Sequence, residues 1–251
     1  MRRSALSILI AMCFGFAVAH ARAADLTVLG AGPVDGTFQK LAPAFMRATG
    51  HKVEATFDTV GAVQNKLKAG EKADVIILSA SAIDELEKAG ALLVGSGVEV
   101  GRGMSGLAVR AGARVPDIST PDAFKRTLLA ARSVAYVDPA AGATTGIFFA
   151  KLLERLEIAD EVNKKALLLR RGFQVAEAVA EGRAEIGNTN LTELIPHKSV
   201  TVVGPIPDPL GLVIPFVAAV SATSTNAEPA RALIAFLTSP EARAEFKAAG
   251  L

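Results

Sequence analysis

The segment LGAGPVDG, residues 29–36, follows the first strand-like stretch beyond the apolar N-terminal segment. A dinucleotide-binding turn spaces its glycines as G-x-G-x-x-G, so that the backbone can approach a pyrophosphate. Here Gly30, Gly32 and Gly36 are spaced G-x-G-x-x-x-G, and Pro33 removes a backbone N–H from the segment. The spacing argues against a dinucleotide site. It indicates a strand-to-helix turn that contacts a small ligand at Gly32 and Pro33.

Hydroxyl groups and glycine follow two further strand-like stretches. Thr59 and Gly61 come directly after VEATFD, and Thr144 and Thr145 follow SVAYVDPAAGA. Threonines at such positions either cap a helix or offer a hydroxyl group to a ligand. Because open α/β sheets bind ligands at the ends of their strands, we expect all four residues to contact the ligand.

Guanidinium and amide groups follow later strand-like stretches. Arg170 and Arg171 end one of them, and Asn188 and Asn190 lie in GNTN after another. A guanidinium group suits a bidentate pair with a carboxylate ligand, although such arginines also form ordinary surface ion pairs. An amide donates and accepts hydrogen bonds, and it also forms turns. We take Arg171 and Asn190 as ligand-binding candidates.

Three acids fall in or beside these segments and are candidates for a general base, namely Asp35, Asp138 and Glu193. A carboxylate there serves equally well as a helix cap or a hinge contact. His51 and His197 show no metal-ligand spacing, and we expect both at the surface. The chain contains no G-x-S-x-G, P-loop or H-E-x-x-H motif. Hydrolase chemistry therefore has no support, and we expect neither a metal nor another cofactor.

Short apolar stretches alternate along the chain with helical patterns that end at glycine. The stretch 75–78, VIIL, is apolar on both faces, as in a central strand covered by helices on both sides. A helical pattern over 36–49 precedes Gly50. This alternation predicts an α/β fold with mostly parallel sheets flanked by helices.

Proline and glycine cluster at 101–106 and at 204–211, where we expect the chain to cross between two lobes. The sequence thus predicts a discontinuous first lobe, residues 24–104 plus 210–251, and an inserted second lobe, residues 105–209. A cleft between the lobes would hold the ligand.

The first residues have the pattern of a secretory signal. Arg2 and Arg3 precede an apolar run from about residue 6 to 19, and the small residues of Ala21-Arg22-Ala23 follow it. The run is short of the roughly 20 residues that span a bilayer. We expect residues 1–23 to be a cleaved signal peptide and the mature protein to be exported to the periplasm.

Composition narrows the class of the mature chain. Removing the signal also removes Cys13 and three arginines, so the 228 remaining residues have no disulfide and carry 24 basic against 25 acidic side chains. A net charge of −1 with one tyrosine and no tryptophan argues against nucleic-acid binding. We expect a monomer of one large or two small domains.

Several stretches together resemble the periplasmic molybdate-binding proteins and the wider class of type II solute-binding proteins. In chain order they are LTVLGAG, AFMRATGHKV, ADVIILSA, SVAYVDPAAGATTG, AEAVAEGRAEIG and FLTSPEARAEFKAAGL. The resemblance implies two α/β lobes that close by a hinge on a small anion. Hydroxyl groups and backbone amides at helix N-termini would hold the anion, for delivery to the permease of an ABC-type transporter.

The chain departs from the molybdate pattern at two positions. Pro33 stands where that family has a serine, and Asn190 stands where it has a tyrosine; Thr59, Thr144 and Thr145 supply the remaining hydroxyl groups. A buried oxygen left without a donor costs about 1–3 kcal/mol. We therefore expect di- and tricarboxylates to bind better than molybdate.

The stretch DISTPDAFKRTLLAARSVAYVDPAAG also resembles the aconitate isomerase branch of the same architecture. That branch moves a double bond within a tricarboxylate. Two functions thus remain open at this point. The first is capture of a small anion, either an oxyanion or a di- or tricarboxylate, and the alternative is interconversion of trans- and cis-aconitate by proton transfer in the same cleft.

Overall fold

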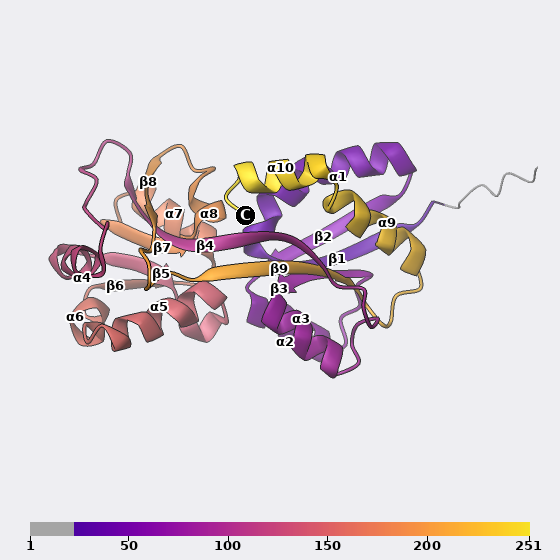
Figure 1. Cartoon of the computed structure of the whole chain (residues 1–251), viewed down its shortest axis with the longest axis horizontal. Helices are drawn as coiled ribbons and strands as arrows, with labels where there is room; N and C mark the ends of the chain where they lie inside the picture. The colour runs from indigo at the N-terminus through magenta and orange to yellow at the C-terminus, as the bar shows by residue number, and fades with distance from the viewer. Residues whose placement is uncertain (1–22) are drawn as a thin grey trace, which may run out of the picture.

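The computed structural model describes residues 23–251. They form two α/β lobes side by side, as the sequence predicts (Figure 1). The predicted signal peptide, with Cys13, lies outside this part of the chain except for Ala23. Within the described part, no helix is both long and apolar enough to cross a membrane. The strands are β1 (Asp25–Ala31), β2 (Lys52–Asp58), β3 (Val75–Ser79), β4 (Val98–Arg110), β5 (Val134–Val137), β6 (Ala166–Leu169), β7 (Ile186–Asn190), β8 (Val200–Pro205) and β9 (Val213–Val220).

Most parallel strands are followed by a helix. The N-termini of these helices therefore lie at the edge of the sheet where the parallel strands end. A short 3₁₀ turn, Pro139–Ala141, precedes α5. The helices are α1 (Gly32–Thr49), α2 (Val60–Lys68), α3 (Ala80–Lys88), α4 (Pro121–Ala130), α5 (Thr144–Arg155), α6 (Ala159–Asn163), α7 (Gly172–Ala180), α8 (Leu191–Leu194), α9 (Ala227–Leu237) and α10 (Pro240–Ala248).

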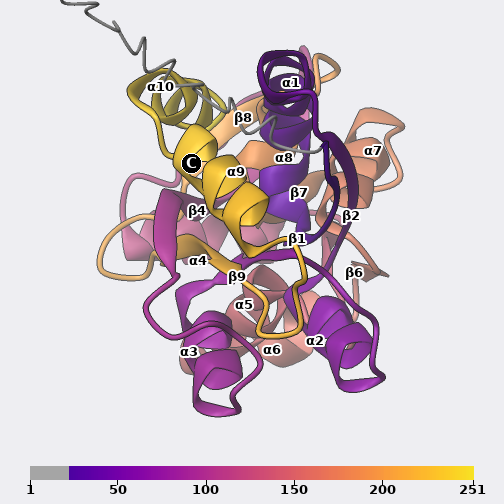
Figure 2. The same cartoon turned by 90° about the vertical axis from the view of Figure 1, so that its right-hand side faces the viewer.

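The sheet of the first lobe has the order β2-β1-β3-β9-β4. Strands β2, β1 and β3 are parallel, whereas β9 is antiparallel to both β3 and β4. Helices α1, α9 and α10 cover one face and α2 and α3 cover the other (Figure 2). Strand β3 is buried along its whole length between these layers. This burial explains its uninterrupted apolar sequence.

The sheet of the second lobe has the order β4-β7-β5-β6, with β8 also paired to β4. Strands β7, β5 and β6 are parallel, and β4 is antiparallel to β7 and β8. Phe124, Phe149 and Val162, from α4, α5 and α6, form the core on one face. Helices α7 and α8 pack on the other face. Each lobe therefore has a parallel sheet that becomes antiparallel toward the strands shared between the lobes.

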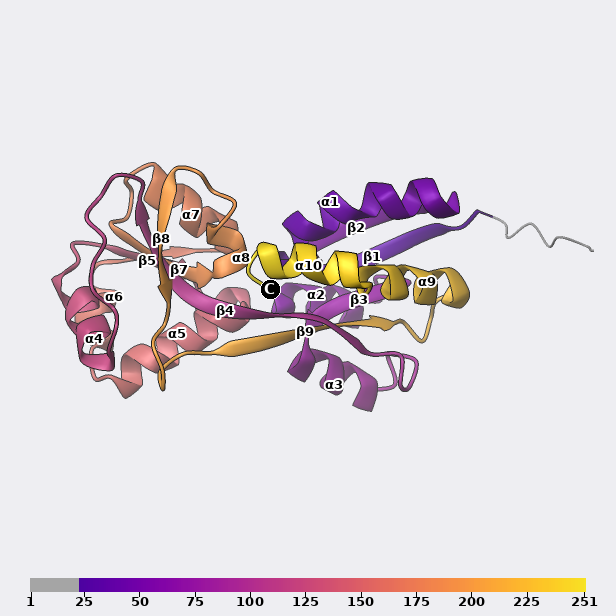
Figure 3. The ribbon, with the colours of Figure 1, turned by 45° about the horizontal axis from the view of Figure 1, so that its top comes forward.

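Strands β4 and β9 run side by side between the lobes (Figure 3). The first half of β4 pairs with β9 through Met104↔Val213, and its second half pairs with β7 from Ser105 onward. One continuous strand thus belongs to both sheets. The expected lobe boundary at 104/105 lies within β4 and the one at 209/210 lies in the turn between β8 and β9; we keep both as our proposal for the domain division.

Helix α1 begins at Gly32, four residues before the start that the sequence suggested. Ala31 precedes the first turn in an extended conformation, and Pro33 lies within that turn. Proline is favourable there because its φ is already helical and its missing N–H has no partner in a first turn. Gly30 lies within β1, where a Cβ would overlap the ring of Phe57. The glycine-rich segment is therefore a strand end and a helix N-terminus, not a loop.

Candidate functional site

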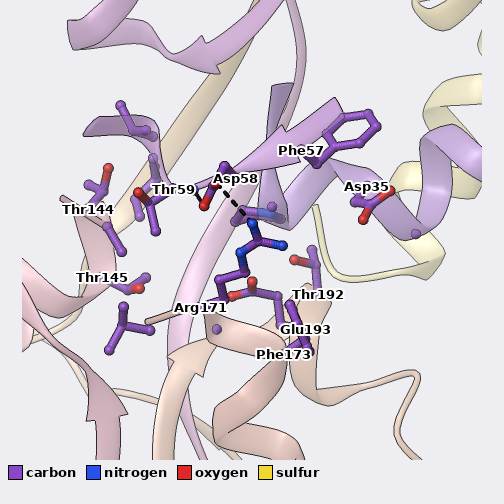
Figure 4. A pocket seen from close by; sticks show the side chains of 18 of the residues that line it. Asp35, Phe57, Asp58, Thr59, Thr144, Thr145, Arg171, Phe173, Thr192 and Glu193 are labelled. Carbon is purple, nitrogen blue, oxygen red and sulfur yellow. Dashed lines mark hydrogen bonds and ion pairs between the residues drawn. The ribbon is translucent and has the colours of Figure 1, made fainter. Parts of the chain in front are cut away.

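A cavity of about 330 Å³ lies between the lobes, within the usual size range of small-molecule sites. The first residues of α1, α2, α5 and α7 line it, together with the end of β2 and the α8 region. The N-terminus of a helix carries a partial positive charge and unpaired N–H groups. Four helices therefore direct a positive potential toward one space (Figure 4).

The cavity brings together most of the ligand-binding residues expected from the sequence. Those that line it are Gly32, Pro33, Thr59, Thr144, Thr145 and Arg171. Figure 4 shows Thr59, Thr144 and Thr145 on one side of Arg171 and Glu193 on the other. These residues come from both lobes, so the cavity exists only where the lobes meet.

Gly61 does not line the cavity, although its position beside Thr59 suggested ligand contact. Its backbone N–H donates to the carbonyl of Gly142 across the lobes at 2.9 Å. A Cβ at Gly61 would lie 2.9 Å from the Gly142 Cα, so only glycine allows this approach. The Thr59 hydroxyl group donates to the carbonyl of Ala141 in the same region. Gly61 is therefore a contact between the lobes.

Asn190 also lies outside the cavity lining, and its side chain has no exposed surface. It caps α8, because its amide oxygen accepts hydrogen bonds from the N–H and the hydroxyl group of Thr192. Asn188 is buried as well, and its amide bonds to Ser105 and to the carbonyl of Gly106 on β4. Both asparagines thus act as structural residues of β7, and their amides do not face the cavity.

Arg171 supplies a guanidinium group to the cavity lining. It precedes α7, and its Nη2 lies 3.0 Å from Oδ2 of Asp58, which forms an ion pair between the lobes (Figure 4). The side-chain oxygen of Gln174 accepts hydrogen bonds from the backbone N–H groups of Arg170 and Arg171, which fixes this turn. Arg170 is exposed and does not line the cavity. Of the two arginines, only Arg171 is placed to meet a ligand.

The first turn of α5 carries the two neighbouring threonines. Thr144 is half-buried and Thr145 is buried, and both line the cavity. Within residues 23–251, no side chain caps this helix at Ala143. Gly146 allows the turn to pack directly on the end of β5, where a Cβ would overlap the Val137 carbonyl. This first turn therefore has hydroxyl groups and a helix dipole directed at the cavity, without a protein side chain as cap.

Glu193 lies on the opposite wall, on α8. Its carboxyl group fits against Gly172, the first residue of α7, where a Cβ would overlap it. A Cβ at Gly32, the first residue of α1, would lie 3.1 Å from Oε1 of the same carboxyl group. The hydroxyl group of Thr189 donates to Oε2 at 2.7 Å. Gly32 thus leaves room for a carboxyl group of the protein itself.

Burial raises the pKa of Glu193 to about 7. The hydrogen bonds from the Thr189 hydroxyl group and from the backbone of Asn190 act in the opposite direction, because they stabilise the charged form. The nearby negative charge of Asp35 raises the pKa further. A carboxyl group with such a pKa exchanges a proton readily near neutral pH, which is the property of a general acid or base.

The other expected bases lie in different surroundings. Asp138 caps the 3₁₀ turn by accepting from the N–H of Ala140 and does not line the cavity. Asp35 lines the cavity but is half-exposed and accepts from the side chain of Gln39. Of the three acids, Glu193 is the one that lines the cavity with its carboxyl group confined between Gly172 and the hydroxyl group of Thr189.

Both histidines differ from the surface positions expected for them. His51 is buried, with 9% of its surface exposed, and its Nδ1 accepts from the backbone N–H of Ala24. His197 lines the cavity, and its Nδ1 is buried without a hydrogen-bond partner in the described part of the chain. His197 comes three residues after the short helix α8, which the periodicity did not indicate.

Apolar side chains form the rest of the cavity wall, and sequence analysis did not single them out. They include Phe57, Val60, Phe173, Ile214 and Phe216. Asp58 was also missed, although it occupies the last position of β2 directly before Thr59. Its place at a strand end, next to an expected ligand-binding residue, was the available signal.

A family model described as bacterial extracellular solute-binding protein matches residues 26–251. The chain belongs to this family. A Pseudomonas protein named aconitate isomerase is 36% identical to it over 232 residues, which cover 90% of this chain and 87% of the relative.

Solved structures support the same fold. The periplasmic molybdate-binding protein of Azotobacter vinelandii matches with a TM-score of 0.73 at 22% identity, over 90% of this chain and 97% of that one. The sulfate-binding protein of Mycobacterium tuberculosis matches with a TM-score of 0.71 at 20% identity, over 90% and 86% of the two chains. The chain therefore has the α/β periplasmic binding protein fold of type II.

Proposed function

We propose that this solute-binding protein is an isomerase that moves a proton within a small polycarboxylate, in the manner of an aconitate isomerase. The observation that carries the proposal is Glu193, whose carboxyl group lies in the cavity wall with its pKa raised to about 7. Capture of an anion does not require a group that exchanges a proton near neutral pH, whereas proton transfer within a substrate does. The 36% identity to the aconitate isomerase supports the same conclusion.

The chemistry requires a base and a site for negative charge. In the proposed reaction the ionised Glu193 accepts a proton from the carbon next to a substrate carboxylate, which leaves an enolate-like anion. The neutral carboxyl group then donates a proton to the carbon two positions away, and the double bond moves between them. No atom is gained or lost.

Other groups that line the cavity stabilise that anion. The first turn of α5, with Thr144 and Thr145, and the guanidinium group of Arg171 line the same cavity as Glu193. Oriented N–H dipoles and a fixed cation stabilise developing charge without reorganisation. The apolar residues of the wall and the contact between the lobes exclude water, which strengthens these interactions.

Proton NMR tests the proposal. Mature protein is incubated with trans-aconitate in deuterated water, and the appearance of cis-aconitate with multiple turnovers is the expected result. Tight binding with an unchanged spectrum would contradict an isomerase. A thermal-shift series with molybdate, sulfate and di- and tricarboxylates measures binding separately, because a ligand at a hundredfold excess over its Kd stabilises the fold by about 2.7 kcal/mol.

The second candidate function is capture of a small anion for the permease of an ABC-type transporter. The four helix N-termini around one cavity favour it, as does the fold shared with proteins named for molybdate and sulfate binding. Pro33 and the buried Asn190 make a carboxylate the expected cargo. Unchanged ligand after binding, with the carboxylates giving the larger thermal shifts, is the result that this function predicts.

Both functions fit export to the periplasm as a monomer, which we propose from the N-terminal pattern and the extracellular family. Mass spectrometry of the periplasmic fraction is expected to show a chain that begins at Ala24. A membrane-retained chain with its original N-terminus would contradict cleavage. Light scattering of the purified chain tests the monomer.

A further inference from the structure

Thr189 lies beside the proposed base but does not itself line the cavity. It belongs to β7, its side chain has no exposed surface, and its hydroxyl group donates to Oε2 of Glu193 at 2.7 Å. We propose that Thr189 is a positioning residue that holds Oε2 of Glu193, so that Oε1, on the side of Gly32, exchanges the proton with the substrate. This inference rests on the proposed isomerase and deepens it.

The geometry explains why the carboxyl group needs such a contact. Glu193 belongs to α8, a helix of four residues, which is too short to be rigid by itself. Thr189 belongs to a central strand, in register with Gly106 on β4 and followed directly by the helix cap Asn190. The hydroxyl group of a central strand therefore provides a fixed donor for a carboxyl group on a short helix.

Gly172 completes the arrangement from the other side. The absence of a Cβ leaves space that the carboxyl group fills, between the first turn of α7 and the hydroxyl group of Thr189. A rotation of the Glu193 carboxyl group that moved Oε2 to the position of Oε1 would break the hydrogen bond from Thr189. Gly172 thus makes room for both oxygens of the carboxyl group, and the hydrogen bond from Thr189 to Oε2 distinguishes one from the other.

The hydroxyl group also affects the ionisation of Glu193. Its hydrogen bond favours the charged form and opposes the effect of burial on the pKa. The titratable or charged groups that line the same cavity are Asp35 on α1, Asp58 on β2, Arg171 before α7 and His197 after α8. These groups remain in every variant described below, so a change in titration reports on the Thr189 contact.

Infrared difference spectroscopy of the whole mature protein measures the contact without relying on activity. The carboxyl band of Glu193 is assigned by its loss in Glu193→Gln and is then followed against pH in Thr189→Val. We expect the midpoint of this variant to rise by about one pH unit, as loss of one hydrogen bond to a carboxylate predicts. Thr189→Ser, which keeps the hydroxyl group, is expected to titrate as the wild type does.

Thr127→Val is the matched control, because the Thr127 hydroxyl group donates to the carbonyl of Asp117 and lies outside the cavity lining. Its titration is expected to follow the wild type. An unchanged midpoint in Thr189→Val, or equal shifts in the valine and serine variants, would overturn the role of Thr189. Circular dichroism and thermal unfolding establish that each variant is folded.

The pH profile of trans-aconitate turnover links the contact to catalysis. The acidic limb of kcat/KM is expected to move upward in Thr189→Val by the same amount as the infrared midpoint, and to return in Thr189→Ser. A shifted midpoint with an unshifted profile would overturn the positioning role alone. Absence of turnover in the wild type would instead overturn the proposed isomerase, whatever the infrared titration shows.

Discussion

The first turns of α5 and α7 face the same cavity but different groups. The turn of α7 begins at Gly172, which lies against the carboxyl group of Glu193, whereas the turn of α5 presents Thr144 and Thr145 to the open part of the cavity. Both helices offer a positive dipole end. The comparison shows that one kind of element serves two purposes, holding an acid of the protein on one wall and meeting an anion from outside on the other.

Among the variants that test this comparison, removal of the proposed base Glu193 is expected to have the largest effect, on turnover. Glu193→Gln keeps the shape of the side chain but cannot accept the substrate proton, so kcat is expected to fall by about 10²–10⁴-fold. Binding of the polycarboxylate, measured by thermal shift, is expected to persist. Glu185→Gln is the control, because Glu185 pairs with Arg132 at the surface. Equal turnover in Glu193→Gln and the wild type would exclude Glu193 as the base.

The stability of the protein is expected to fall between about pH 4.5 and 7 because of the same residue. The pKa of Glu193 rises from the ordinary 4.5 to about 7 on folding, so the unfolded chain loses this proton first as the pH increases. The contribution of Glu193 to the free energy of unfolding is fully present below pH 4.5 and is lost as the pH rises toward 7. It amounts to at most about 3 kcal/mol. Urea unfolding of the wild type and Glu193→Gln across this range measures it. Parallel curves for the two proteins would contradict a raised pKa.

A methyl group at position 172 is expected to displace the carboxyl group from α7. Gly172→Ala adds a Cβ that overlaps Glu193, which costs about 1–3 kcal/mol of stability and moves the base. Gly36→Ala is the matched variant on α1, where a Cβ meets no atom within 4 Å. It is expected to stabilise the helix by about 0.5–1 kcal/mol. A neutral Gly172→Ala in thermal unfolding would show that the α7 turn does not confine Glu193.

Replacement of Arg171 is expected to have a smaller effect than these variants, and the effect is on the affinity for the ligand. Arg171→Lys keeps the charge but loses the planar fork that binds a carboxylate, so the Kd for a polycarboxylate is expected to rise about tenfold in calorimetry. Stability is expected to change little, because the ion pair with Asp58 is partly exposed. Arg170→Lys, at the exposed neighbour, serves as the control. Equal affinities in the two variants would remove Arg171 from the ligand site.

A hydroxyl group of α5 is expected to have the smallest effect. Thr144→Val removes one hydroxyl donor at a half-buried position, where water can replace part of the hydrogen bond, so the expected loss is about 0.5–1.5 kcal/mol, or roughly a two- to tenfold rise in Kd. The pH profile of turnover is expected to stay as in the wild type, because Thr144 does not contact Glu193. A displaced profile would mean that the two walls of the cavity are not independent.

The two-lobe α/β fold could be predicted from the sequence because its signals are local. The apolar residues of β3 and the glycine after α1 each depend on a few neighbouring residues. The start of α1 was placed too late, because Gly32 and Pro33 were interpreted as a loop. A proline in a first turn is compatible with either interpretation until the preceding residue is known to be extended.

The site could be predicted only in part, because its key contacts join distant parts of the chain. Thr59, Thr144, Thr145 and Arg171 were found from their places after strands, which is a local signal. The choice of Glu193 among three acids depends on Gly172, and nothing in the sequence pairs these two residues. Asn190 is a ligand candidate in the sequence because its amide follows a strand and stands where the molybdate-binding proteins have a tyrosine; its role as a cap is not visible there, because a helix of four residues leaves no periodicity.

The contact between Gly61 and Gly142 has a consequence for how such a protein can evolve. The lobes meet there through backbone atoms, with the Gly61 N–H 2.9 Å from the Gly142 carbonyl oxygen. Because this hydrogen bond joins backbone atoms, cavity residues such as Phe57, Phe173 and Ile214 can be exchanged by mutation without removing it. A gene duplicate could thus acquire a new ligand, or lose or gain a base, while the lobes still come together in the same way.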